Sequence, residues 1–266
     1  MLELIIFLSF FYISIISIVG YGKLFHKIFL NKINYDEDIT IYLGFYGIML
    51  LTLLSLFTSF FLKHNFYHNI IIHFIGIFFF FHFRLKENSK FYKKIFYISI
   101  CLIPILLISK THDDFSFYHY PFTKFLTEHH IIFGMGNINT GYNFISSLFF
   151  LNSSFYLPFI NLYSFHFTII SFLLFFNYFL LVKIFSSRTH EFFKYFYLLT
   201  FIFFNLSFNR LAEFGMDKGG QLLIVILIIS LFEIIIKKNN KKKIDNILLL
   251  IPLFGLCIST KTYFLT

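Results

Sequence analysis

The chain has 266 residues, of which 58% are hydrophobic and only 13% are charged. Soluble domains carry about 25% charged and about 45–50% apolar residues, so this composition excludes an ordinary solvated globule and predicts an all-α, polytopic transmembrane helix bundle. The net charge of +9 requires no nucleic-acid partner, because basic residues at membrane borders explain it.

Long apolar runs bounded by charged residues predict about eight membrane spans. A helical span needs about 20 apolar residues to cross about 30 Å of hydrocarbon, and charges are costly at its centre. The runs are Leu2–Val19, Ile39–Leu62, Phe66–Phe83, Ile95–Ser109, Phe159–Val182, Phe192–Phe208, Gly220–Ile236 and Ile247–Phe264. Because lipid satisfies no backbone groups, each run is expected to be helical.

The basic residues fall mainly in one alternating set of loops. This set contains Lys23, Lys27, Lys32, Arg84, Lys86, Lys90, Lys93, Lys94, Lys183, Arg188, Lys194 and the run Lys237 to Lys243. Only six of the 22 basic residues lie in the other set. The positive-inside rule therefore places the N-terminus and the loops 110–158 and 209–219 outside a plasma membrane.

The chain shows no internal repeat and no dividing linker, so we expect one transmembrane domain over residues 1–266. Its first apolar run has neither a basic region before it nor a small-residue cleavage site after it, which predicts a retained span. The sequence stops at Thr266 without a polar tail after the last run. We therefore expect the N-terminal portion of a longer protein.

The loop 110–158 holds the densest group of polar side chains. It is also apolar enough to lie on a membrane, and Phe115–Leu126 and Phe144–Leu151 are predicted to form short interfacial helices. A helix that starts at Asp113 would place Asp114 and Tyr118 on one face, four residues apart.

The acidic pair Asp113 and Asp114 is the main candidate for chemistry. Adjacent carboxylates repel each other, which favours a raised pKa in one of them and suits it to take a proton from a hydroxyl. His112, Tyr118 and His119 are candidate substrate-binding neighbours. The alternative is that the two acids only cap a helix and hold the loop in water.

The second outer loop, 209–219, offers charges that suit a phosphate. Arg210 and Lys218 are candidates for holding a pyrophosphate, since arginine can bind it with two parallel hydrogen bonds. Glu213 and Asp217 would orient these cations or bind a divalent metal ion. Local salt bridges in a short polar loop are the alternative.

Two motifs carry a resemblance to a known superfamily. They are Asp114-x-x-x-Tyr118-His119-x-Pro121 and Arg210-x-x-Glu213-x-Gly215-x-Asp217. Together they resemble uncharacterised bacterial multi-pass proteins related to the GT-C glycosyltransferases, which use polyprenyl-phosphate-linked sugars. The resemblance covers roughly residues 110–220. It implies sugar transfer with inversion, Asp114 as base or ligand of a divalent ion, and a bacterial inner membrane location.

In that superfamily the acidic pair usually lies in the first outer loop with the N-terminus inside, whereas here it follows the fourth predicted span. The expected function is transfer of a sugar from a polyprenyl-phosphate donor to an envelope glycan, lipid or protein. A multi-pass transporter or flippase, and a non-catalytic membrane assembly subunit, are the alternatives. Transporters place ionisable groups near the bilayer midplane, where this sequence has almost none.

Overall fold

The structure is a computed structural model that describes residues 2–31, 40–83, 89–108, 113–143, 146–187, 189–207, 217–236 and 240–260. Within these ranges the chain is helical and contains no strand, which confirms the predicted all-α class. The long helices are α1 (Leu2–Phe29), α3 (Leu43–Ser59), α4 (Phe66–His82), α5 (Ser89–Leu106), α8 (Phe167–Phe185), α9 (Glu191–Leu206), α10 (Asp217–Ile236) and α11 (Asn240–Thr260).

Each predicted apolar run overlaps one of these helices, but fewer than eight of them are long and apolar enough to cross a membrane. Among the described residues three segments qualify: Leu2–Phe29, Ser164–Phe185 and Lys218–Ile236. Shorter apolar helices lie at Leu43–Ser59, Phe66–His82 and Asp245–Thr260. A helix of 17 residues rises about 26 Å, slightly less than the hydrocarbon thickness of about 30 Å.

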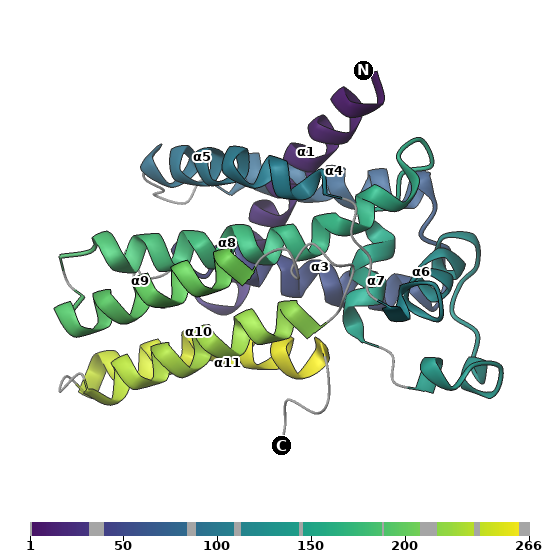
Figure 1. Cartoon of the computed structure of the whole chain (residues 1–266). Coiled ribbons are helices and arrows are strands. Elements are labelled where there is room, and N and C mark those ends of the chain that lie inside the picture. The colour runs from purple at the N-terminus through teal and green to yellow at the C-terminus, as the bar shows by residue number, and fades with distance from the viewer. Residues whose placement is uncertain are drawn as a thin grey trace.

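In the described ranges, two short α-helices and four 3₁₀ turns lie between α5 and α8. These are α6 (His119–Glu128), α7 (Ser147–Ser154), η1 (Asp113–Phe115), η2 (Met135–Asn137), η3 (Thr140–Asn143) and η4 (Asn161–His166). α6 and α7 gather at one end of the bundle, on the right in Figure 1. This end is called the α6–α7 end below.

Successive long helices alternate in direction, as side-chain contacts at their ends show. Near the end opposite to α6 and α7, Lys183 of α8 donates a hydrogen bond to Glu233 of α10 at 2.9 Å. At the α6–α7 end, the Ser147 hydroxyl donates to Ser259 of α11 at 2.9 Å. The start of α10 and the end of α11 therefore lie beside α7, while α8 and α10 finish together at the other end (Figure 1).

Glycines bring α1 very close to α3 and α4. A Cβ atom at Gly20 of α1 would collide with the backbone oxygen of Gly76 of α4, and one at Gly47 of α3 would collide with that of Ile18. Small residues that allow backbones to approach are typical of helix contacts in membranes, where burial of apolar surface gives little driving force. Polar pairing then adds specificity, since the Tyr21 hydroxyl donates to Ile72 O at 2.7 Å.

Candidate functional site

The acidic motif forms a tight turn, with the start of α6 later than predicted. Asp113–Phe115 is a 3₁₀ turn, and α6 begins at His119. The amide of Tyr118 donates to Asp114 O at 3.2 Å, which closes one helical turn between the two elements. The Tyr118 hydroxyl also donates to Asp114 Oδ2 at 3.5 Å, so the predicted contact between these residues is present at the long limit of a hydrogen bond.

Tyr118 lies inside a close-fitting set of neighbours. Its ring centroid is 4.3 Å from that of His119 and 6.3 Å from that of Phe149 in α7. His119 is buried and packs 5.5 Å from the same Phe149 ring. A Cβ atom at Gly141 would lie 2.8 Å from the Tyr118 ring, so the absent side chain at Gly141 lets this loop close over the tyrosine.

α7 differs from the predicted interfacial helix Phe144–Leu151. All eight of its residues, Ser147–Ser154, are buried, although half of them are polar. α7 packs against α3, α4, α6, α8 and α11, which leaves no face for a membrane surface. The hydroxyls of Ser153 and Ser154 donate to carbonyls of the preceding turn, Ser153 Oγ to Phe150 O at 2.8 Å and Ser154 Oγ to Leu151 O at 2.7 Å. The part of the loop 110–158 that forms α7 is therefore packed inside the bundle and does not lie on the membrane surface.

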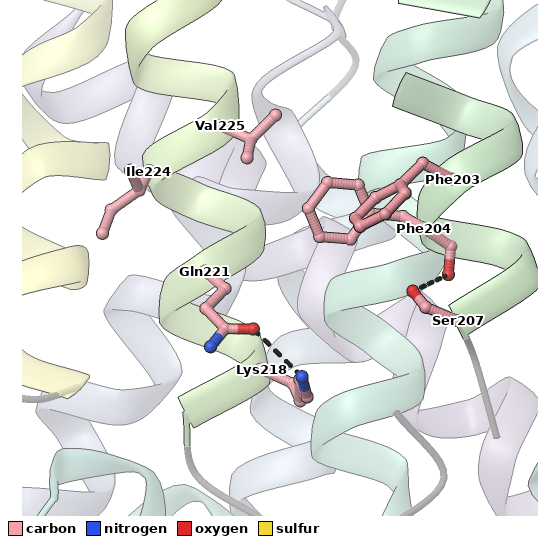
Figure 2. Close-up of a pocket in the computed structure, with 7 residues that line it drawn as sticks. All are labelled: Phe203, Phe204, Ser207, Lys218, Gln221, Ile224 and Val225. Carbon is pink, nitrogen blue, oxygen red and sulfur yellow. Dashed lines mark hydrogen bonds between the residues drawn. The ribbon is translucent and has the colours of Figure 1, made fainter. Parts of the chain in front are cut away.

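Lys218 lies in a groove between α9 and α10. The groove has a volume of about 410 Å³ and is lined by Phe203, Phe204, Ser207, Lys218, Gln221, Ile224 and Val225. Figure 2 shows the phenylalanine rings between the two helices, with Lys218 and Gln221 together toward one end. Lys218 Nζ donates to Gln221 Oε1 at 3.2 Å. The groove is mostly apolar, with one cation.

The residues after the acidic turn and the start of α10 each pack against α7, on the neighbouring residues Phe149 and Leu148. Tyr118 and His119 pack against Phe149, and a Cβ at Gly219, the residue after Lys218, would lie 3.4 Å from Leu148. Asp114 and Lys218 are thus carried by segments that share one support at the α6–α7 end. This end therefore offers a carboxylate that can accept a proton, Asp114, and a cation that can hold a phosphate, Lys218.

Several predicted site residues lie outside the described ranges or are described only in their backbone. His112, Arg210 and Glu213 lie outside the described ranges. Asp113 and Asp217 begin η1 and α10, but their side chains are not described. Among the described residues, no three His, Cys, Asp or Glu side chains come together as metal ligands.

Sequence reasoning missed a buried histidine pair beside the site. The rings of His64 and His68 stack with centroids 4.4 Å apart and an interplanar angle of 4°. His64 Nδ1 lies 2.6 Å from Ser153 Oγ of α7, and the Thr58 hydroxyl lies 3.1 Å and 3.0 Å from Nε2 of His64 and His68. The i, i+4 spacing of the two histidines was the available signal.

Asn69 extends this network to α7 and the segment after it. Its amide Nδ2 donates to Ser153 O at 2.8 Å and to Tyr156 O at 3.1 Å. The amide of His64 also donates to Leu126 O of α6 at 2.8 Å. The turn between α3 and α4 therefore holds α6 and α7 in place through hydrogen bonds to both.

Acidification is expected to weaken this network. Burial, and next the nearby His68 ring, lower the pKa of His64 from 6.5 to about 3, against an opposing contribution from the Ser55 backbone. Folding thus favours neutral His64, and its stabilising contribution is complete above pH 6.5 and is lost as the pH falls toward 3. The free energy of unfolding should fall by up to about 1.4 kcal/mol per pH unit across this window.

The measurement is unfolding in detergent micelles between pH 7 and pH 4, followed by circular dichroism, for the wild type and for His64→Asn. Asparagine keeps a hydrogen-bonding side chain but does not titrate. The variant should show a shallower decline with pH. Parallel declines in the two proteins would contradict the assignment to His64.

A second buried pair, Lys183 and Glu233, corrects the predicted border of one span. Lys183 was expected in a loop after a span ending at Val182, but α8 continues to Phe185. Lys183 is buried within α8 and pairs with Glu233 at 2.9 Å. The pair lines a small cavity with Tyr42, Ser230, Ile234, Asn246 and Leu249 at the end opposite to the candidate site.

The fold and the site together define an all-helical protein with candidate membrane-spanning helices and a polar site at one end of the bundle. The chain belongs to the family described as "Domain of unknown function (DUF8201)", whose model matches residues 3–266. No curated protein matches the chain. No solved structure matches it.

Proposed function

We propose that this protein is a membrane glycosyltransferase of GT-C type that works at the α6–α7 end of the bundle. It transfers a sugar from a polyprenyl-phosphate-linked donor to an envelope glycan, lipid or protein. The supporting observation is that the Asp114–Tyr118 turn and the start of α10, with Lys218, pack on consecutive residues of one buried helix. An acid and a cation from distant parts of the chain are thereby held at the same end.

The roles follow from the chemistry of the transfer. Asp114 accepts the proton of the acceptor hydroxyl as that oxygen bonds to the anomeric carbon. The bond between the anomeric carbon and the donor phosphate oxygen breaks, and Lys218, with Arg210, stabilises the leaving phosphate. Tyr118 orients the Asp114 carboxylate, and buried His119 fixes the Tyr118 ring. Asp113 is the second carboxylate of the catalytic pair and His112 a further substrate contact, while Glu213 and Asp217 orient the cations or bind a divalent ion.

The placement of buried charges supports transfer over transport. The buried charged side chains among the described residues are Lys23, Lys183 and Glu233, and each lies near the end of its helix opposite to α6 and α7. A transporter is expected to have charged groups near the middle of the bilayer, where they bind the transported ion or substrate. The buried ionisable side chain in the middle of α4, His73, instead bonds to Ser154 O of α7 at 3.2 Å. A lipid-linked donor instead reaches an enzyme laterally, so its chemistry belongs at the membrane surface.

The direct test is turnover of a polyprenyl-phosphate-linked sugar by the purified protein in nanodiscs. Asp113→Asn and Asp114→Asn are compared separately with Glu128→Gln, a change to an exposed acid at the end of α6. Transfer should be lost with Asp114→Asn and kept with Glu128→Gln. Unchanged transfer in both Asp113→Asn and Asp114→Asn, at normal expression, would end the catalytic proposal.

The proposal includes eight membrane crossings with the α6–α7 end outside. The alternating directions of the helices support this topology, and the shorter helices can be accommodated by local thinning of the bilayer.

The topology is tested by cysteine labelling in a Cys101→Ser, Cys257→Ser background. Phe133→Cys and Lys63→Cys should react with an impermeant maleimide added on the side of the membrane where the N-terminus lies. Phe185→Cys, at the end of α8, should react only from the other side. Phe133 and Phe185 are 85% and 79% exposed, so both can be labelled. Labelling of Phe133→Cys and Phe185→Cys from the same side would refute this arrangement.

A further inference from the structure

The groove between α9 and α10 lies on a side of the bundle that is rich in exposed apolar residues. α9 exposes Leu199, Phe203 and Leu206, and α10 exposes Ile228 and Leu231. Both helices pack on α8, and the groove runs between them (Figure 2). A molecule that enters from this side therefore comes from the hydrocarbon region of the bilayer.

The polar and apolar parts of the groove are separated along α10. Lys218 and Gln221 lie in its first turns, and Val225 follows on the same helix face, seven residues after Lys218. From Lys218 to Val225 the helix rises about 10 Å at about 1.5 Å per residue. On α9, which runs in the opposite direction, Ser207 lies toward the polar end and Phe203 toward the apolar end (Figure 2).

This order matches the order of groups in a lipid phosphate. An anionic headgroup near Lys218 would lie at the α6–α7 end, and its hydrocarbon chain would run toward Phe203 and Val225. The volume of about 410 Å³ is within the usual range of ligand sites, about 300–1,000 Å³. It holds the headgroup-proximal part of a long chain, while the remainder lies among the bilayer lipids.

We infer that the α9–α10 groove binds the hydrocarbon chain of a lipid-linked phosphate, with the phosphate at Lys218. This inference rests on the proposed function, since it identifies the lipid as the sugar donor or its spent carrier. It adds a defined entry route between two named helices. It also makes Lys218 the residue that distinguishes an anionic lipid from a neutral one of equal chain length.

The test uses a polyprenyl phosphate that carries a diazirine near its headgroup, in phosphatidylcholine nanodiscs. The corresponding diazirine polyprenyl alcohol is the matched neutral probe. Photolabelling should map to peptides of α9 and α10, and the phosphate should label about tenfold more than the alcohol. In Lys218→Gln this preference should fall to about one, because the cation is lost while the apolar groove remains.

The second part of the test fills the groove with a larger side chain. Val225→Trp should reduce labelling by the phosphate probe about tenfold by occupying the chain site. Ile228→Trp is the matched control, since Ile228 is exposed on the same helix and is not part of the groove lining. A melting temperature equal to that of Ile228→Trp would show that Val225→Trp is folded. If Val225→Trp melts at a lower temperature, Val225→Phe is used in its place.

The outcomes separate this inference from the proposed function. Equal labelling of the wild type and a folded Val225→Trp, or equal labelling by phosphate and alcohol, would overturn the inference. Equal competition by phosphatidic acid would also overturn it, because the groove would then be a general phospholipid site. Specific labelling without any sugar transfer would keep the lipid-phosphate site and refute the glycosyltransferase proposal.

Discussion

Replacing Glu233 by glutamine is expected to lower the free energy of unfolding by about 3–5 kcal/mol. The change leaves the Lys183 ammonium group buried without its carboxylate partner at 2.9 Å. Both side chains are less than one-tenth exposed, so water can replace little of the lost interaction. Lys183→Met should have a similar effect, because it leaves the Glu233 carboxylate buried without the same ammonium group.

The double variant Lys183→Met, Glu233→Leu should recover most of this loss, since replacing a buried pair by apolar residues is often neutral. Unfolding in detergent, followed by circular dichroism, measures all three proteins. The control is Glu128→Gln, which breaks the Lys124–Glu128 pair, with side chains 29% and 54% exposed. That exposed pair should contribute at most about 1 kcal/mol. Equal destabilisation by Glu233→Gln and Glu128→Gln would contradict the structural role assigned to the buried pair.

The helices themselves were predictable because hydropathy and local spacing determine them. Every apolar run selected from the sequence overlaps a helix, and the four-residue spacing of Asp114 and Tyr118 brings the two side chains together. Hydropathy does not determine the length of the helix that forms: α4 is apolar on average, but its 17 residues are short for a bilayer.

Contacts between distant segments were not predictable in the same way. Ending a span at its first charged residue placed Lys183 in a loop, because the partner that permits its burial, Glu233, lies 50 residues later. Likewise, Ser153 and Asn152 make α7 look like a surface helix, whereas the His64 ring and the packing of five helices bury it. The histidine network depends on residues 84 to 89 positions apart, which no local pattern reveals.

Asp114→Asn is expected to reduce the rate of sugar transfer by about 10²–10⁴-fold at unchanged expression and stability. Asparagine preserves the size of the side chain and can still accept a hydrogen bond from Tyr118, but it cannot take a proton from the acceptor. The loss should therefore appear in kcat and not in the labelling of the α9–α10 groove, which depends on Lys218. Single-turnover measurements with a lipid-linked sugar would separate the chemical step from donor binding.

Tyr118→Phe provides the graded comparison for that result. It keeps the ring that packs on His119 and Phe149 and removes only the hydroxyl 3.5 Å from Asp114. Because this contact is long, we expect a loss of only about tenfold, equivalent to about 1.4 kcal/mol in the barrier. If Tyr118→Phe reduced transfer as much as Asp114→Asn, the hydroxyl would have to act directly on the substrate. If Asp114→Asn retained wild-type kcat, the base would have to be another residue.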